Sequence, residues 1–338
     1  MKILFLTRLF WSHVGGIEKH IDEISKILVK RGHLVSVMTT RHNAELRTHE
    51  PVHGYNIIRF DQPNIKYLGL IYTWFWIVKN INLFIKSDIV HIHDVFIWYW
   101  PLRVLLPFKK VFITYHGQWG KYPIPYVDIL QKKIGRYFSN GVISIGKYID
   151  KYYGIKSDII SYGGVNLPNN KVKKDNNLLL YVGRLDSNTS LPKILEFIHN
   201  YHTTVYGSYV KVIFCGDGEL KDECKRYGKV LGFVDPSPYY EKAKFVFASG
   251  YLTILEAIAN KCLVFTTYGH NLQKDYYQLT HFRDFMILCE DERELGENFA
   301  YYNRYIKKTE AIINKGYKWV MDQSWQKMAD NYYKLWKI

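Results

Sequence analysis

Cysteine is scarce in this chain of 338 residues, and the four that occur form no C-x-x-C pair: Cys215, Cys224, Cys262 and Cys289. Three of them lie in or beside apolar runs, which is typical of buried, reduced thiols. Clusters of histidine and cysteine at the spacing of metal ligands are missing as well. We therefore expect neither a disulfide framework nor a metal site, and interpret the acidic residues 290–292 as the first turn of a helix.

Long apolar runs are also missing. The longest candidate, residues 67–78, is bounded by Lys66 and Lys79 and is shorter than the roughly 20 residues that a membrane-spanning helix needs. The N-terminal apolar run is interrupted by Thr7 and Arg8, and no small-residue cleavage site follows. This run is therefore predicted to be a first buried strand rather than a signal peptide, which favours a cytoplasmic protein.

Acidic residues are few relative to basic ones. The chain has 31 Asp and Glu against 46 Lys and Arg, a formal net charge of +15. Such a charge favours anionic partners, such as nucleotide phosphates or an anionic membrane surface. Zinc-finger and RNP-like motifs are not found, so nucleic acid is not an expected partner. The hydrophobic content of 48% indicates a globular protein, and the length predicts two domains.

Strand-like and helical patterns alternate along the chain, which predicts parallel sheets in an α/β fold. The first set of strands is predicted at residues 3–7, 34–40, 55–60, 88–93, 110–115 and 141–145. A turn-rich stretch around Gly163-Gly164 and the polar residues 169–177 follow and are interpreted as a linker. The second set is predicted at 178–182, 211–215, 229–233, 245–248, 262–266 and 285–289.

A glycine pair, Gly15-Gly16, separates the first predicted strand from an amphipathic stretch that ends at Gly32. Glycines before a helix allow close backbone approach to a ligand, and the free N–H groups favour an anion. Gly15 and Gly16 are therefore candidate phosphate-binding residues, with a plain structural turn as the alternative. The dinucleotide pattern G-x-G-x-x-G is missing, which disfavours a nicotinamide-dependent oxidoreductase.

An ordered set of motifs runs nearly the length of the chain. After Gly15-Gly16 come Asp88-Ile89-Val90-His91-Ile92-His93, Tyr115-His116-Gly117, Gly163-Gly164-Val165, Tyr181-Val182-Gly183-Arg184-Leu185, Gly216-Asp217-Gly218-Glu219, Leu231-Gly232-Phe233-Val234-Asp235, Leu255-Glu256-Ala257-Ile258-Ala259 and Ser324-Trp325. In this set the chain resembles family 4 glycosyltransferases of the GT-B fold. The resemblance implies two Rossmann-like parallel-sheet domains facing each other across a cleft. It predicts an acceptor domain at 1–165, a nucleotide-sugar domain at 166–317 and a helix at 318–338 that crosses back to the first domain.

The resemblance also implies which residues bind the donor. Arg184 is the cation expected at the diphosphate, and Leu252 and Thr253, at the start of a helix, are expected to offer it backbone N–H groups. Glu256 is implied to accept hydrogen bonds from the ribose, and Val234 to line the donor site. A solvated helix carboxylate is the alternative interpretation of Glu256.

Two histidines at predicted strand ends are the candidate catalytic residues. By its match to the family, His116 would contact the donor sugar near the reacting carbon, and His93 lies at the end of the preceding strand. A histidine at a strand end is otherwise a satisfied core or surface group, and this alternative stays open for both.

Two departures from the family pattern concern the sugar. The family has a glutamate eight positions before the ribose-binding one, where this chain has Ala248, and a Lys-Gly pair where this chain has Thr189-Ser190. Lys193 could replace the missing cation, although a helix-surface lysine is the simpler interpretation. The departures leave open a catalytically lapsed GT-B module that binds nucleotide or glycan.

Two aromatic runs suggest the acceptor. Residues 67–78 and 96–102 are rich in Trp, Tyr and Phe, and lysines bracket the first run. A buried helix is the alternative to an interfacial patch near anionic headgroups.

The predicted function is a metal-independent and, by resemblance, retaining transferase without cofactor. It would move a sugar from a nucleotide diphosphate donor to a glycan or lipid-linked acceptor, in the cytoplasm and peripheral to the membrane inner face.

Overall fold

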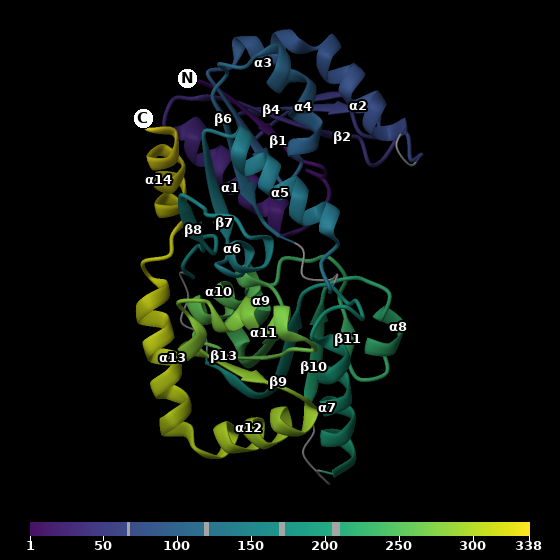
Figure 1. Cartoon of the computed structure of the whole chain (residues 1–338). Coiled ribbons are helices and arrows are strands. Elements are labelled where there is room, and N and C mark those ends of the chain that lie inside the picture. Colours follow the sequence, from purple (N-terminus) through teal and green to yellow (C-terminus); the bar gives the residue numbers. More distant parts are fainter. Residues whose placement is uncertain (66–67, 118–121, 169–172, 205–209) are drawn as a thin grey trace. The chain divides into compact units, whose positions relative to one another are not determined.

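The computed structural model describes residues 1–65, 68–117, 122–168, 173–204 and 210–338, which divide into two compact units (Figure 1). Unit 1 comprises Met1–Ser161 and Trp325–Ile338, and unit 2 comprises Tyr162–Ser324. The division after Ser161 lies slightly before the predicted boundary at residue 165.

Unit 1 is built on an eight-stranded sheet of order β3-β4-β2-β1-β5-β6-β7-β8. The strands are β1 (Lys2–Leu6), β2 (Leu34–Thr40), β3 (His49–Val52), β4 (Tyr55–Phe60), β5 (Ile89–His93), β6 (Val111–Tyr115), β7 (Gly141–Ile145) and β8 (Ile159–Ser161). The pairings are parallel except that β3 runs antiparallel to β4. The prediction of a parallel sheet therefore misses this edge strand.

The helices of unit 1 are α1 (Gly16–Lys30), α2 (Leu68–Lys79), α3 (Ile81–Lys86), α4 (Phe96–Leu105), α5 (Tyr126–Phe138), α6 (Tyr148–Tyr153) and α14 (Trp325–Trp336). Side chains of β6 show that α14 and α5 cover opposite faces of the sheet. Thr114 contacts Tyr332 of α14 (Oγ1 to Oη, 3.1 Å), whereas its neighbour Tyr115 lies against Gly135 of α5. Successive residues of a strand point to opposite faces, so the sheet is buried on both sides.

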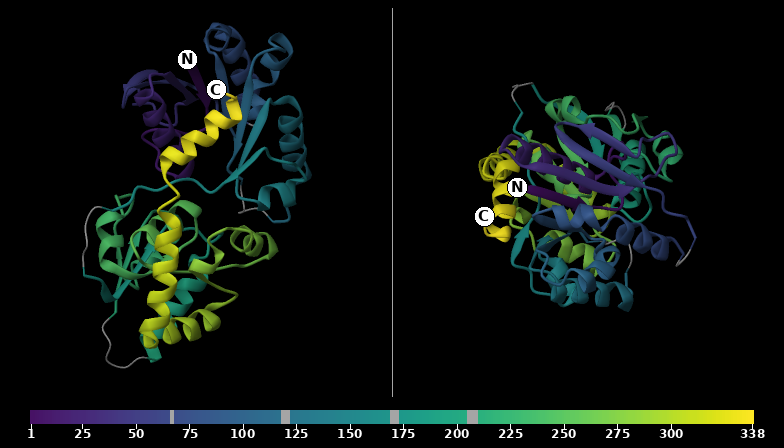
Figure 2. Two further views of the ribbon diagram at one scale, coloured as in Figure 1. Left: turned by 90° about the vertical axis from the view of Figure 1, so that its left-hand side faces the viewer. Right: turned by 90° about the horizontal axis from the view of Figure 1, so that it is seen from above.

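The last helix belongs to unit 1, where α14 packs against α1 and the strands β7 and β8 (Figure 2). The predicted helix over 318–338 is wrong in extent. Helix α13 ends at Val320, and the chain then pairs with an extended segment through a hydrogen bond from Val165 N to Gln323 O (2.8 Å). This pairing interrupts the helical pattern before Trp325 begins α14.

Unit 2 is built on a six-stranded parallel sheet of order β11-β10-β9-β12-β13-β14. The strands are β9 (Asp175–Val182), β10 (Lys211–Cys215), β11 (Lys229–Val230), β12 (Ala243–Ala248), β13 (Leu263–Thr267) and β14 (Met286–Cys289). The helices are α7 (Leu191–Thr204), α8 (Lys221–Cys224), α9 (Ser237–Lys242), α10 (Tyr251–Ala259), α11 (Asn271–Gln278), η1 (Arg283–Phe285), α12 (Glu292–Arg304) and α13 (Ile306–Val320).

Most predicted strands are confirmed, and the exceptions have local causes. The strand predicted at 229–233 ends at Val230, ahead of Gly232, which has a φ of 72°. Strand β9 begins at Asp175, inside the predicted linker, whose residues 169–172 lie outside the described part of the chain. The four cysteines are buried and free, as expected. In the described residues, no helix is long and apolar enough to cross a membrane.

Candidate functional site

Three adjacent strands bring the candidate residues of unit 1 to one edge of the sheet. Leu6 pairs with Ile92, and His93 pairs with Thr114, so β1, β5 and β6 end side by side. The Gly15-Gly16 turn, His93 and His116 all follow these strand ends. In open α/β sheets this carboxyl edge is where ligands bind.

The glycine turn begins α1, with Gly15 as an extended N-cap. A Cβ on Gly15 would lie 2.3 Å from Glu18 Oε2, so the position requires glycine while that carboxylate is folded back over the helix start. His13 Nδ1 lies 3.0 Å from Glu18 Oε1. Burial raises the pKa of Glu18, although its own amide and His13 act to lower it. The first turn of α1 therefore already holds one acidic group.

The structure brings the two candidate catalytic histidines together. His93 Nδ1 lies 2.9 Å from His116 Nε2, and the two rings stack with centroids 5.2 Å apart. Among the described residues, nothing hydrogen-bonds to the buried Nε2 of His93. His116 itself is half-buried, which leaves it accessible at the sheet edge.

A network behind this pair reaches α14. His20 of α1 packs edge-on against His116 (5.0 Å between centroids) and lies 2.9 Å from the hydroxyl of Tyr332. Trp336 Nε1 donates to His91 Nδ1 at 3.0 Å. Burial lowers the pKa of His116 to about 4, and burial together with the other histidines lowers the pKa values of His20, His91 and His93 well below the usual value. These imidazoles are therefore neutral at pH 7.

Asp94 fixes the loop that carries His116. This residue follows β5 with a φ of 62°, and both carboxylate oxygens lie 3.2 Å from the amide nitrogen of His116. Lys132 Nζ donates to the same carboxylate at 2.9 Å. Burial alone would raise the pKa of Asp94, but Lys132 and His116 outweigh it and lower that pKa. Asp94 is therefore an anionic clamp on the His116 backbone.

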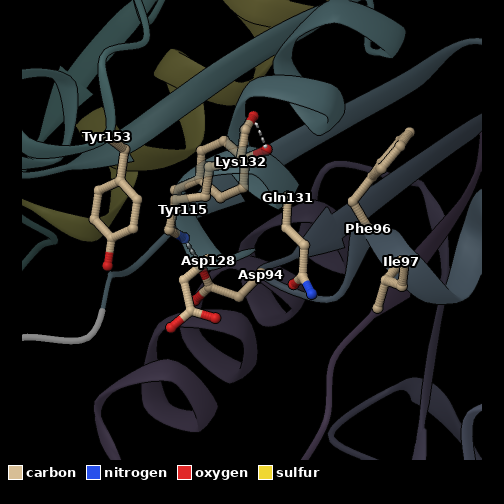
Figure 3. A pocket seen from close by; sticks show the side chains of 8 residues that line it. All are labelled: Asp94, Phe96, Ile97, Tyr115, Asp128, Gln131, Lys132 and Tyr153. Atoms are coloured by element: carbon tan, nitrogen blue, oxygen red, sulfur yellow. Dashed lines mark hydrogen bonds and ion pairs between the residues drawn. The ribbon is translucent and has the colours of Figure 1, made fainter. Parts of the chain in front are cut away.

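A pocket opens on the α5 face beside this clamp (Figure 3). Its volume is about 140 Å³, and its lining consists of Asp94, Phe96, Ile97, Tyr115, Asp128, Gln131, Lys132 and Tyr153. None of these residues is among the predicted site residues, although Tyr115 belongs to the motif Tyr115-His116-Gly117 and Phe96 and Ile97 belong to the aromatic run 96–102. Asp94, a polar residue directly after the candidate His93 at a strand end, gave a further local signal. Asp128, Gln131, Lys132 and Tyr153 come from helices whose packing the sequence does not state.

In unit 2, Val182 pairs with Ala248, so Arg184 and the start of α10 leave neighbouring strands at the same edge. Arg184 is exposed, and its guanidinium donates to Asp186 (2.7 Å) and Asn188 (3.2 Å). An anionic ligand would compete with Asp186 for this cation.

Helix α10 presents backbone donors. The hydrogen bond from Ile254 N to Gly250 O (3.0 Å) is the first of the helix, so the amides of Leu252 and Thr253 precede it. Such amides have no partner within their own helix. The amide of Tyr251 donates to the hydroxyl of Tyr276, whose ring stacks on that of Tyr251 with centroids 3.9 Å apart.

Glu256 and Val234 lie further along the same unit. Glu256 is half-buried and interacts with the hydroxyl of Tyr240, whose pKa is raised well above the usual value by burial and by this carboxylate. The solvated-carboxylate alternative therefore does not describe Glu256. Val234 is 41% exposed in the loop after β11, beside the exposed Phe233.

The departures from the family pattern have structural consequences. Ala248 is fully buried at the end of β12, and Thr189 Oγ1 accepts from Leu191 N (3.2 Å) at the start of α7. Lys193 Nζ donates to Tyr268 O (2.8 Å) and Glu290 O (2.6 Å). Since two carbonyl groups already hold this ammonium, the structure does not support Lys193 as a replacement for the missing cation.

The tryptophans of the aromatic run 67–78 face the rest of unit 1; residue 67 of this run lies outside the described part of the chain. Trp74 donates from Nε1 to Ile97 O (2.7 Å), and Trp76 stacks on Phe60 (4.8 Å). Both tryptophans are half-buried, whereas Ile71 and Phe75 are 56% and 67% exposed. The tryptophans are therefore packing residues, and any interfacial contact of α2 falls to its exposed apolar side chains, of which Ile71 and Phe75 are the most exposed, with Leu68, Tyr72 and Val78 beside them.

The apolar exposure continues beyond α2 onto α4, the turn after it and α5. Exposed large apolar residues there include Val104, Phe108, Tyr126 and Tyr137. Within the described residues, no group of three or more His, Cys, Asp or Glu side chains is placed to hold a metal ion.

Comparison with known proteins gives a family match for part of the chain. The profile of Glycosyltransferase Family 4 matches residues 14–153. A curated relative from Campylobacter jejuni, GalNAc-alpha-(1->4)-GalNAc-alpha-(1->3)-diNAcBac-PP-undecaprenol alpha-1,4-N-acetyl-D-galactosaminyltransferase, is 30% identical over 152 residues. The matched segment covers 41% of this chain and 39% of that relative.

Solved structures match over nearly the whole chain. Sucrose-phosphate synthase from Thermosynechococcus elongatus has a TM-score of 0.77 at 15% identity, covering 99% of this chain and 98% of its own. HepE from Anabaena, in complex with UDP and glucose, has a TM-score of 0.73 at 15% identity, with coverage of 99% and 98%. At these identities the likeness establishes the fold, which is GT-B. It does not identify the reaction, which has to be argued from the residues of the site.

Proposed function

Because residues 14–153 match the model of Glycosyltransferase Family 4, we propose that the chain is a member of this family and transfers a sugar from a nucleotide diphosphate donor to a glycan or lipid-linked acceptor. The observation that carries this proposal is the His93–His116 pair at the carboxyl edge of unit 1, inside the matched segment. A neutral histidine pair beside a glycine turn, with His93 buried and His116 half-buried, suits contact with a sugar and its leaving group.

Unit 2 would bind the nucleotide diphosphate. Arg184 and the amides of Leu252 and Thr253 would contact the phosphates, and Glu256 would accept hydrogen bonds from the ribose. Support for these roles comes from the shared sheet edge and from the exposed guanidinium. Gly15 and Gly16 of unit 1 would offer further backbone donors.

The proposed reaction retains the anomeric configuration. The acceptor oxygen attacks the anomeric carbon on the face from which the diphosphate departs, and the departing phosphate oxygen takes the acceptor proton. Positive charge develops on the sugar as the bond to the diphosphate breaks. A neutral His116 can accept or donate a hydrogen bond there without repelling that charge. Arg184 and helix amides would offset the charge on the diphosphate, so we propose no metal requirement and no cofactor.

We further propose a membrane-proximal acceptor. The name of the Campylobacter relative specifies an undecaprenol-linked substrate. In this chain, exposed apolar residues on α2, α4 and α5 lie on a protein of net charge +15. Apolar residues with basic surroundings are the combination that binds anionic headgroup regions.

The first experiment is a thermal-shift screen with UDP, GDP, ADP and their common sugar conjugates, followed by transfer and donor-hydrolysis assays in excess EDTA. A ligand that binds only the folded protein raises its apparent stability, which identifies the nucleotide. We expect turnover of the stabilising nucleotide sugar to persist in EDTA. Binding without transfer or hydrolysis would instead support a lapsed GT-B module, in keeping with Ala248 and Thr189.

A further inference from the structure

The α5-face pocket beside Asp94 has no role in the donor chemistry described above. Its walls combine Ile97 with three aromatic rings, Phe96, Tyr115 and Tyr153, which are only 4%, 1% and 2% exposed. The Lys132 ammonium lies over both tyrosine rings, at 4.2 and 5.0 Å. Asp128 and Gln131, one helical turn apart on α5, add a carboxylate and an amide (Figure 3). Polar groups converging on a concave, partly aromatic surface are typical of small-ligand sites.

The charge of this pocket differs from that of the chain. Two carboxylates, Asp94 and Asp128, face one ammonium, Lys132, so the charged lining sums to −1 on a protein of net charge +15. A phosphate or a carboxylated ligand would be repelled by this lining, although the net charge of the whole chain attracts anions. The charge balance therefore favours an uncharged ligand that donates hydrogen bonds.

The polar side chains of the pocket differ in whether they already make hydrogen bonds or ion pairs. The Asp94 carboxylate is held by the His116 amide and by Lys132, whose ammonium also lies over the ring of Tyr115 at 4.2 Å. By contrast, the side chains of Asp128 and Gln131 make no hydrogen bond or ion pair with any other described residue. A carboxylate accepts two hydroxyl donors, and a side-chain amide both donates and accepts.

We propose that this pocket binds one neutral sugar ring of the acceptor, with Asp128 and Gln131 as its hydroxyl-binding residues and the half-buried Ile97 as its apolar wall. The inference rests on the proposed transferase function and assigns part of the acceptor site. A sugar ring fits because its hydroxyl groups pair with the carboxylate and amide while its C–H groups pack on the side chain of Ile97. The Asp94 clamp joins the pocket to the His116 loop, so the acceptor would bind beside a catalytic histidine.

The test is saturation-transfer NMR with the full chain and three probes: methyl α-glucopyranoside, methyl N-acetyl-α-galactosaminide and methyl α-glucuronide. We expect at least one of the two neutral glycosides to bind and the anionic glucuronide to bind about tenfold more weakly. Asp128→Asn and the pocket-filling Gln131→Trp should each weaken the neutral probe by about tenfold. The matched controls are Asp322→Asn and Gln326→Trp, which make the same changes at exposed positions and should leave binding unchanged.

Three results would overturn the inference: no binding of either neutral glycoside, tighter binding of the glucuronide, or equal binding by the parent and both pocket variants. Native-like thermal unfolding of each variant shows that any loss is local. Nucleotide-sugar turnover is measured separately with the same proteins. Glycoside binding that depends on Asp128 in a protein without turnover would reject the transferase and keep the pocket, whereas normal acceptor KM in both variants would reject the pocket alone.

Discussion

The candidate residues of the two units are held in different ways. In unit 1, His93 is 2% exposed and lies in a network that runs through His20 to Tyr332 of α14. In unit 2, Arg184 stands in solvent, paired with an acidic neighbour two residues away. A side chain locked by buried neighbours can hold one geometry, whereas an exposed ion pair can exchange its partner for a ligand. We therefore expect unit 1 to control turnover and unit 2 to control nucleotide affinity.

The largest expected difference between the units is in acid stability. The pKa of His116 is about 4 in the folded chain and near 6.5 when unfolded, so the unfolded state binds more protons between these values. Above pH 6.5 these histidines do not lower the free energy of unfolding. As the pH drops toward 4, the free energy of unfolding falls by up to about 3 kcal/mol because of His116, with further losses from His20, His91 and His93.

Hydrogen exchange at pH 7.5 and pH 5 would locate this loss. Amides of β5, β6 and α14 should lose protection before those of β9 and β12, because the neutral histidines lie in the network beneath α14. His116→Gln removes one titrating group and should flatten the pH dependence of unfolding. Earlier opening of unit 2 would contradict the assignment.

The next expected effect is on turnover. His116→Ala should lower kcat by at least about a hundredfold while nucleotide affinity stays within about threefold, because the contact forms chiefly in the transition state. Single-turnover kinetics and calorimetry measure the two quantities. His49→Ala, a change on the exposed edge strand β3, is the matched control. A fully active His116→Ala protein would remove the catalytic role.

A smaller effect is expected in unit 2. Arg184→Ala should weaken nucleotide diphosphate binding by about 1.5–3 kcal/mol, near the lower end because Asp186 already competes for the guanidinium. Glu256→Ala should weaken binding in the same direction through the ribose. Arg293→Ala is the control, since that arginine is exposed in the same unit and paired with Glu297. Unchanged affinity in both site variants would place the nucleotide elsewhere.

The smallest expected effect concerns membranes. Replacing Ile71 and Phe75 by serine should reduce co-sedimentation with anionic vesicles several-fold, and high salt should do the same to the parent chain. Phe233→Ser, at an exposed site in unit 2, should have no effect on sedimentation. Trp76→Ser should instead destabilise the fold, because that ring stacks on Phe60. Vesicle binding that depends on neither Ile71 nor Phe75 would reject the α2 surface.

Local patterns predicted most of the fold. Apolar runs marked twelve of the fourteen strands found in the described residues, because a strand buried on both faces is apolar along its length. The two exceptions are β3 and β8. Strand β3 is a short edge strand that contains Pro51, and β8 has only three residues, so neither carries such a run.

The order of elements, the glycine turns and the motif set that indicates the family can therefore be predicted from the amino-acid sequence alone. Each of these depends on residues close together in the chain. The tertiary structure decided which side chains meet: His93 with His116 across 23 residues, Asp94 with Lys132 across 38, and His91 with Trp336 across 245. Strand order and helix packing set these contacts. The tertiary structure is therefore needed to show that Trp74 and Trp76 pack inward, that two carbonyl groups hold Lys193, and that a pocket lies beside the His116 loop.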